Sequence, residues 1–83
     1  MRVNNFKPDR KYVFSYEEFV KHFGEDKDLE KVDGAEVQVI GRFAGRILYH
    51  NSKVNTDVHR FINPGLTKCI GKVRLWKIYI HFQ

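Results

Sequence analysis

The 83-residue sequence has a single cysteine, Cys69, and no apolar run longer than three residues. One cysteine excludes an internal disulfide. Runs this short exclude a membrane-spanning helix, which needs about 20 apolar residues. The first residues, Met1 to Pro8, lack the apolar h-region of a secretory signal. We therefore expect a cytoplasmic or nuclear protein that is not secreted and does not enter a membrane.

Residues that bind metals or perform catalysis are also sparse. His50, His59, Cys69 and His81 lack the close ligand pairs that mark zinc motifs. The acidic segment 25–34 offers no register with the alternating oxygen ligands, central glycine and final glutamate of a calcium loop. There is no P-loop and no dinucleotide fingerprint. We therefore expect no enzyme activity, no metal and no cofactor.

Charge is distributed unevenly along the chain. Residues 1–35 carry seven Lys/Arg and eight Asp/Glu, a net charge of −1, whereas residues 36–83 carry eight and two, a net charge of +6. Such asymmetry favours a polyanionic partner, either nucleic acid or an acidic protein surface. The alternative is a basic surface that serves only solubility.

The N-terminal third predicts a polar arm, one helix and a charged connector. The arm covers residues 1–10. Ser15 followed by Glu18 is a capping box that begins a helix over residues 15–23. An apolar stripe on this helix is expected to pack on a sheet, and Gly24 follows it as a terminator. Segment 25–34 is expected to be a solvated connector, tucked onto the core by Leu29 and Val32.

Segment 36–50 alternates with a period of two, which predicts one long, bent β-strand. Its inward residues are expected to be Val37, Val39, Phe43, Ile47 and Tyr49, with Gly41 and Gly45 between them. A glycine inside a strand marks a sharp bend or a close approach. The outward residues include Ile40, Arg42, Arg46 and Leu48, so the strand is expected to present positive charge.

The remainder predicts a turn at 51–53 and further strands. Segment 54–62 fits a short helix or a strand, and the spacing of Val54, Val58, Phe61 and Ile62 favours the helix. Segment 66–70 is expected to be a strand, with Cys69 as a small buried residue and Gly71 as a turn or bulge. Segment 72–82 is expected to be a second long strand that is paired or covered.

Basic residues alternate with aromatic residues in the C-terminal half. Small sheets bind single strands by stacking bases on exposed rings while cations contact the phosphates. We therefore predict a non-catalytic nucleic-acid-binding module for RNA or single-stranded nucleic acid. Because Phe43 and Tyr49 are expected inside, Arg42 and Arg46 are the principal candidates. The full set of candidate contact residues is Arg42, Arg46, Lys53, Arg60, Lys68, Lys72, Arg74, Lys77 and Tyr79.

A protein-interaction module is the alternative hypothesis. Such a module, a small inhibitor or an assembly subunit, would dock its basic sheet on an acidic partner. Ile40 and Leu48 would act as apolar anchors between the arginines.

Residues 11–47 also carry a family resemblance. The run K-Y-V-F, the helix S-Y-E-E-F-V-K-H-F, a charged connector and A-E-V-Q-V-I-G-R-F resemble the start of the N-terminal OB-fold anticodon-binding domain of class II lysyl-tRNA synthetases. The resemblance implies a five-stranded barrel that grips RNA, with Arg42 at the end of its first strand. It supplies no base-stacking residue, because that family's stacking strand has no counterpart after Ser52. It also implies no aminoacylation, since the chain has no catalytic synthetase domain.

These observations predict a single α+β domain over residues 1–83. One N-terminal helix is expected to pack on a small, strongly curved antiparallel β-sheet or an OB-like partial barrel. The parts are the arm 1–10, the helix and connector 11–34, and the basic β-rich part 35–83.

Overall fold

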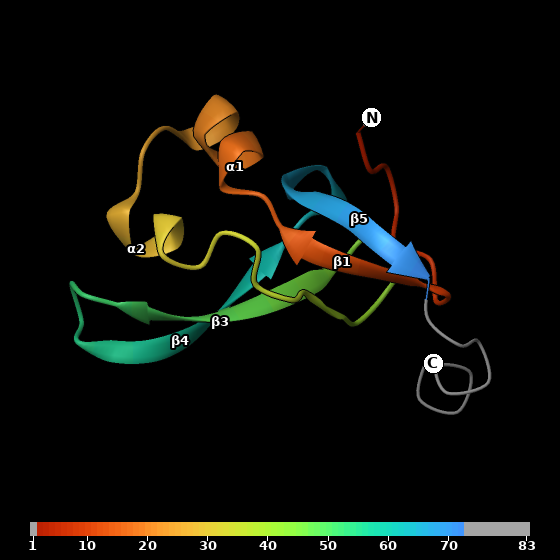
Figure 1. Ribbon diagram of the computed structural model, residues 1–83. Coiled ribbons are helices and arrows are strands. Elements are labelled where there is room, and N and C mark those ends of the chain that lie inside the picture. Colours follow the sequence, from red (N-terminus) through yellow and green to blue (C-terminus); the bar gives the residue numbers. More distant parts are fainter. Residues whose placement is uncertain (1, 73–83) are drawn as a thin grey trace.

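The computed structural model describes residues 2–72 and has an α+β fold (Figure 1). An N-terminal helical region packs against antiparallel strands, as the sequence predicts. Of the strand expected over 72–82, only Lys72 is among the described residues, so Arg74, Lys77 and Tyr79 lie outside them. In chain order the elements are β1 (Arg10–Phe14), α1 (Tyr16–Phe23), α2 (Lys27–Glu30), β2 (Gln38–Val39), β3 (Gly45–Asn51), β4 (Thr56–Ile62), the 3-10 turn η1 (Pro64–Leu66) and β5 (Thr67–Lys72).

The strands form two antiparallel sheets, β1–β5 and β2–β3–β4. Residues 35–37 join them, because the Phe14 amide donates to the Ala35 carbonyl at 2.8 Å and the Val37 amide donates to the Tyr12 carbonyl at 2.9 Å. An isolated bridge between Val13 and Glu36 places β1 beside the segment that leads into β2, and β5, the last described strand, pairs with β1. The described residues do not close this curved arrangement into a barrel.

Helix α1 begins at the predicted cap. The Ser15 hydroxyl accepts a hydrogen bond from the Glu18 amide, and the helix ends at Gly24, which has a positive φ of 85°. Phe19 is buried in the core. Phe23, at the end of the predicted apolar stripe, is 62% exposed. The helix therefore packs through its first turn, and its last turn is exposed at Phe23.

The N-terminal arm is part of the core, which corrects the expectation of a polar extension. Phe6 is 2% exposed and meets the Tyr12 ring edge-on, with 4.9 Å between centroids. Its amide donates to the Arg42 carbonyl at 2.7 Å. Val3 and Phe6 are the two apolar residues among Arg2–Arg10. The burial of Phe6 fixes the path of this segment.

The charged connector contains a short helix, α2, that is anchored by one apolar residue. Leu29 is completely buried, and Val32 packs against the core, as the sequence predicts. Asp26 caps α2 by accepting from the Asp28 and Leu29 amides. The connector is therefore ordered by local capping and a single buried side chain.

Segment 36–50 is a hairpin, so the prediction of one continuous strand is wrong. Residues 40–44 turn the chain, and β2 pairs with β3 in the register Gln38↔Arg46 and Val39↔Gly45. A five-residue turn between these pairs keeps residues of one parity on one face, so the period of two survives the reversal. Phe43 lies in the turn and is 62% exposed, which corrects its expected burial.

The two glycines of this segment have different environments. A Cβ at Gly45 would lie 2.5 Å from Val37 Cγ1 and 3.1 Å from Phe6 Cζ, so glycine admits close packing there. A Cβ at Gly41 would meet nothing within 4 Å. Gly45 therefore admits side chains and not the expected second backbone, whereas Gly41 lies in the turn, where the chain bends as expected.

Within segment 54–62, residues Thr56–Ile62 form strand β4, so the strand alternative is correct and the favoured helix is wrong. β4 pairs with β3 along its whole length, from Asn51↔Thr56 to Gly45↔Ile62. The turn between them covers residues 52–55 and overlaps the turn predicted at 51–53, and Asn55 in it has a positive φ of 52°. The apolar residues that suggested a helix also fit a strand. In this strand Val58 and Ile62 face inward and Phe61 faces outward. Pairing with β3 therefore determines that this segment is a strand.

Strand β5 confirms a strand in the predicted segment 66–70, but it begins at Thr67 and continues through Gly71 to Lys72. Lys11 pairs with Gly71 and Tyr12 with Cys69, so Ile70 is an extra residue in a β-bulge. Cys69 is exposed, which corrects its expected burial.

Candidate nucleic-acid interface

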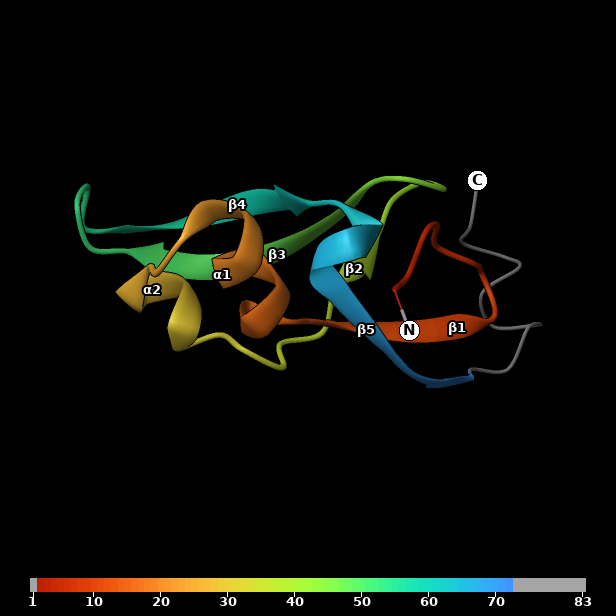
Figure 2. The ribbon, with the colours of Figure 1, turned by 90° about the horizontal axis from the view of Figure 1, so that it is seen from above.

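The two faces of the β2–β3–β4 sheet have different surroundings. Directly opposed residues of antiparallel strands lie on one face. The inner face contains the pairs Gly45↔Ile62, Ile47↔Arg60 and Tyr49↔Val58. Figures 1 and 2 show α1 and α2 on this side of the sheet, and among the described residues no helix covers the other side.

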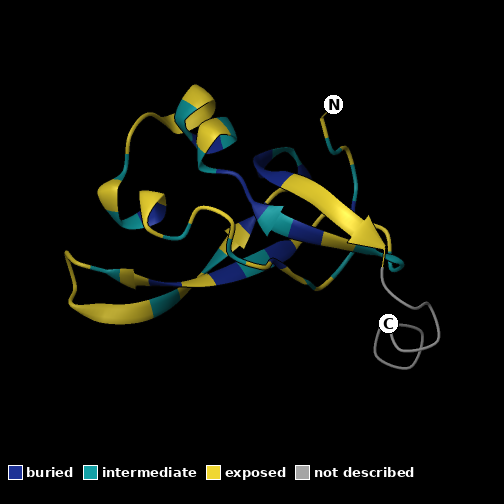
Figure 3. Cartoon of the chain, in the orientation of Figure 1, coloured by how far each residue is buried: buried dark blue, intermediate teal, exposed yellow. Residues whose placement is uncertain are grey.

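The opposite side, here called the outer face, comprises Gln38, Arg46, Leu48, His50, Asp57, His59 and Phe61. Phe61 is 73% exposed and Leu48 is 54% exposed. In Figure 3 most of β4 is coloured as exposed, whereas β3 alternates along its length. An apolar patch of Leu48 and Phe61 therefore lies open to solvent, with Arg46 as the cation beside it and Asp57 paired with His50.

Arg46 is held beside the most exposed ring of this face. It pairs across the strands with Phe61, and its Nε donates to the Gln38 Oε1 at 2.7 Å. Gln38 orients the guanidinium without neutralising it, and no carboxylate among residues 2–72 forms an ion pair with Arg46. A cation and an aromatic face are thus presented together.

Arg42 lies at the turn between β2 and β3, at one end of the sheet. Its guanidinium carbon is 6.0 Å from the Phe43 ring centroid. Ile40, in the same turn, is 45% exposed. The Arg42 carbonyl accepts the hydrogen bond from the buried Phe6 segment, which anchors the turn.

Lys53 lies at the other end, in the turn between β3 and β4. Its amide donates to the Asn51 Oδ1 at 2.9 Å. The neighbouring Ser52 donates to the Asp28 Oδ2 through its amide at 3.0 Å and its hydroxyl at 2.9 Å. The amide bond first, then the hydroxyl bond, holds the pKa of the Asp28 carboxyl below its usual 3.8. This carboxylate ties the Lys53 turn to α2.

The other described candidates lie elsewhere. Arg60 is on the inner face, with its guanidinium carbon 5.3 Å from the Phe19 ring centroid. Lys68 and Lys72 are exposed on β5, in the other sheet. The structure therefore brings Arg46 together with the ends marked by Arg42 and Lys53, and separates Arg60, Lys68 and Lys72 from them.

Phe61 and His59 were not selected as outer-face residues from the sequence. Reading 54–62 as a strand would have revealed them, because Asp57, His59 and Phe61 share a parity opposite to Val58 and Ile62. The helix interpretation grouped Phe61 with Val54, Val58 and Ile62 on one helical stripe instead. The strand interpretation of segment 54–62 is therefore the sequence signal that identifies Phe61 and His59 as outer-face residues.

No family model, no curated protein and no solved structure matches the chain. Within residues 2–72, no helix has the length and apolar character needed to cross a membrane. The same residues contain no cluster of three or more His, Cys, Asp or Glu arranged to hold a metal ion.

Proposed function

We propose that the protein is a non-catalytic module that binds single-stranded nucleic acid, most simply RNA, on the outer face of β2–β3–β4. The observation that carries the proposal is the cross-strand pair of Arg46 and Phe61, in which a guanidinium without a carboxylate partner lies beside a ring that is 73% exposed. Single strands need both elements, a stacking platform and a cation near the phosphates.

The dimensions and charge of the face fit this role. The seven residues of β3 extend about 23 Å, which spans several nucleotides. Arg42 and Lys53 supply positive charge at the two ends of this track. Stacking on Phe61 contributes about 1–3 kcal/mol per base, and Leu48 extends the apolar surface.

We also propose that the fold is an OB-like partial barrel. Its support is the segment 35–39, which pairs with β1 at one end and with β3 at the other, so that the sheet curves. The return of β5 beside β1 fits the Greek-key order that such small barrels share.

The test is a fluorescence-anisotropy titration of a labelled, mixed-sequence RNA oligonucleotide at several salt concentrations. The logarithm of the binding constant is expected to fall linearly with the logarithm of the salt concentration, because phosphate contacts release counterions. Undetectable or salt-independent binding would remove the proposal.

Arg46→Gln and Arg60→Gln form a matched pair on opposite faces of one sheet. Arg46→Gln is expected to reduce the salt slope by about 0.7 for a single strand, whereas Arg60→Gln leaves it unchanged. Equal effects of the two variants would show that overall charge, and not the outer face, governs binding.

A second candidate function is docking on an acidic protein. The observation that favours it is the exposure of Ile40 and Leu48, 45% and 54%, close to Arg42 and Arg46. In this case a partner remains bound after nuclease treatment of a native extract, and the double variant Ile40→Ser/Leu48→Ser loses it. Retention of the partner by that variant would count against docking, and loss of all partners after nuclease would favour nucleic acid.

A further inference from the structure

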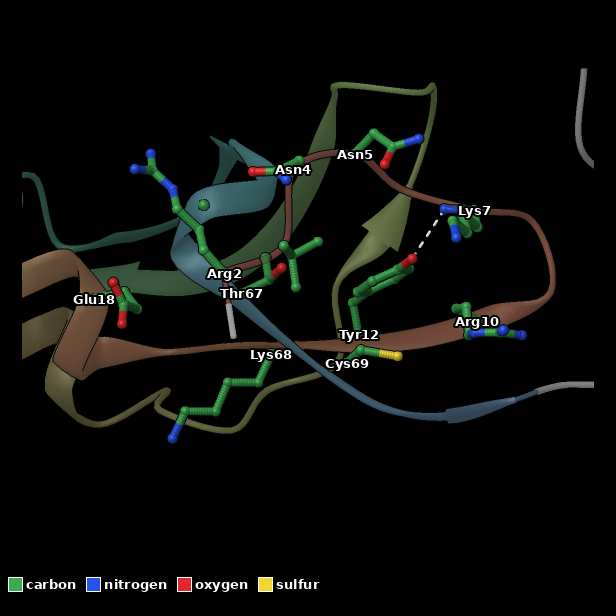
Figure 4. Close-up of a pocket in the computed structure, with 12 residues that line it drawn as sticks. Arg2, Asn4, Asn5, Lys7, Arg10, Tyr12, Glu18, Thr67, Lys68 and Cys69 are labelled. Carbon is green, nitrogen blue, oxygen red and sulfur yellow. Dashed lines mark hydrogen bonds between the residues drawn. The ribbon is translucent and has the colours of Figure 1, made fainter.

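A separate concave surface lies between the N-terminal segment and the β1–β5 sheet. It is a cleft of about 610 Å³, within the range of about 300–1,000 Å³ that is usual for small-molecule sites. Figure 4 shows the N-terminal segment passing over one side of the cleft, with β1 and β5 on the other.

Buried contacts fix the N-terminal wall of this cleft. Phe6 is in the core, and the Lys7 amide donates to the Tyr12 hydroxyl at 2.9 Å. Tyr12 is 3% exposed and lines the floor. A tyrosine hydroxyl that accepts one hydrogen bond still has its own proton to donate. The cleft is therefore formed before any ligand arrives.

The lining is strongly basic. It contains four cations, Arg2, Lys7, Arg10 and Lys68, and one carboxylate, Glu18. Glu18 pairs with Lys21 at 3.3 Å, and Arg10 pairs with Asp9 at 2.7 Å. Among residues 2–72, neither Arg2 nor Lys7 has an ion-pair partner. Lys68 belongs to the opposite parity of β5 from the lining residues Thr67 and Cys69, and Arg10 is already paired with Asp9, so Arg2 and Lys7 are the relevant cations.

These cations occupy two separate places. Figure 4 shows Arg2 at one side of the cleft and Lys7 at the other, next to the Tyr12 hydroxyl that accepts from its amide. Arg2 lies against the η1 turn, where a Cβ added to Gly65 would be 2.9 Å from its Nη2. Because Gly65 has no side chain, the Arg2 guanidinium can pack against the η1 turn.

We propose that this cleft binds a small molecule that carries two phosphate groups, one at Arg2 and the other beside Lys7 and the Tyr12 hydroxyl. Guanidinium groups bind phosphates through paired, charge-assisted hydrogen bonds. The side-chain amides of Asn4 and Asn5, which also line the cleft, offer donors and acceptors to the middle of the ligand. This site uses none of the outer-face residues and goes beyond the function proposed above.

The test is calorimetric titration of the full chain with adenosine 3′,5′-bisphosphate, with AMP and with inorganic phosphate. The bisphosphate is expected to bind about tenfold or more tightly than AMP, because its second phosphate gains its own charged hydrogen bonds. Failure of the bisphosphate to saturate the protein, or equal affinities for it and AMP, would overturn the proposal.

Two variants separate the role of Arg2 from an effect on folding. Arg2→Gln removes the charge, and Gly65→Ala displaces the guanidinium without changing any charge. Arg2→Gln is expected to lower bisphosphate affinity to about that of AMP, and Gly65→Ala is expected to lower it by a smaller amount because the flexible guanidinium can shift. Circular dichroism should stay unchanged in both variants. Lys53→Gln is the control with the same charge change as Arg2→Gln, and it should keep full bisphosphate affinity. Loss of affinity in Lys53→Gln, or no loss in Arg2→Gln, would contradict the assignment.

These experiments test the cleft and the outer face independently. Phe61→Ala is expected to weaken RNA binding and leave bisphosphate binding intact, while Arg2→Gln has the reverse pattern. Bisphosphate binding without RNA binding would retain the cleft and remove the function proposed for the outer face.

Discussion

Ile47 and Leu48 are neighbours in β3, yet one is 2% exposed and the other 54%. The same contrast separates Ile62, 1% exposed, from Phe61, 73% exposed, on β4. Single exposed apolar residues are ordinary. Leu48 and Phe61, however, are diagonal neighbours on the outer face and form a contiguous patch beside Arg46. The comparison shows that the inner face accounts for folding and leaves the outer face free for binding.

The largest expected effect is on stability. Ile62→Ala should lower the free energy of unfolding by about 2–5 kcal/mol, because it opens a cavity in the core. Leu48→Ala, on the other face, should stay within about 0.5 kcal/mol. Urea unfolding followed by circular dichroism measures both. Similar losses would mean that the outer face is also part of the folded core.

Removing the exposed ring should affect binding instead. Phe61→Ala is expected to weaken binding to a single-stranded oligonucleotide by about 1–3 kcal/mol, the contribution of one stacked base. Its stability should be nearly unchanged. Phe23→Ala is the matched control, since Phe23 on α1 is 62% exposed and lies off the sheet. Equal losses of affinity in the two variants, measured by anisotropy, would argue against a specific stacking face.

The two glycines of the β2–β3 hairpin extend the comparison to the backbone. Gly45→Ala should destabilise the protein by about 1–3 kcal/mol, because the added methyl group meets Val37 and Phe6. Gly41→Ala adds its methyl group in open space and should leave stability nearly unchanged. Thermal unfolding of both variants decides the point. A neutral Gly45→Ala would show that the inner face is loosely packed.

The smallest expected effect concerns pH and the Lys53 turn. Since hydrogen bonds from Ser52 lower the pKa of Asp28 in the folded protein, folding favours the carboxylate. Its contribution is fully present above the unfolded value near 3.8 and is lost as pH falls through the lower folded value. The Ser52 amide resonance in NMR spectra should titrate with a midpoint below 3.8. The midpoint should be absent in Asp28→Asn, and a midpoint at or above 3.8 would contradict the assignment.

The local signals of the sequence predicted much of the fold. The Ser15–Glu18 capping box located α1, and alternation identified the inward positions of Val37, Ile47 and Tyr49. These features depend on neighbours within one element, so the sequence carries them directly.

Features that depend on a second element were missed. The alternation over 36–50 is the same for one strand and for a hairpin with a five-residue turn, and only the pairing of Val39 with Gly45 distinguishes them. Phe6 was assigned to a polar arm because its burial depends on Tyr12 and the Arg42 carbonyl. Phe61 was assigned to a helix because β3 had not been placed beside it.

In the candidate site, too, features within one strand were predicted and features that depend on a second strand were missed. Arg46 was predicted correctly to face outward with Leu48, whereas Arg60 was grouped with it on charge alone. The inward position of Arg60 follows from its pairing with Ile47 and its stacking over Phe19. Residue type alone therefore indicates a basic protein, and the strand register decides which cations share a face.

The most direct test of the outer-face proposal is an NMR titration of the labelled protein with a short single-stranded RNA. The Leu48 methyl and Phe61 ring resonances are expected to shift with a common saturation curve, while the methyl resonances of Ile47 and Ile62 stay in place. Shifts of the inner methyl groups with no change at Leu48 and Phe61 would contradict binding on the outer face.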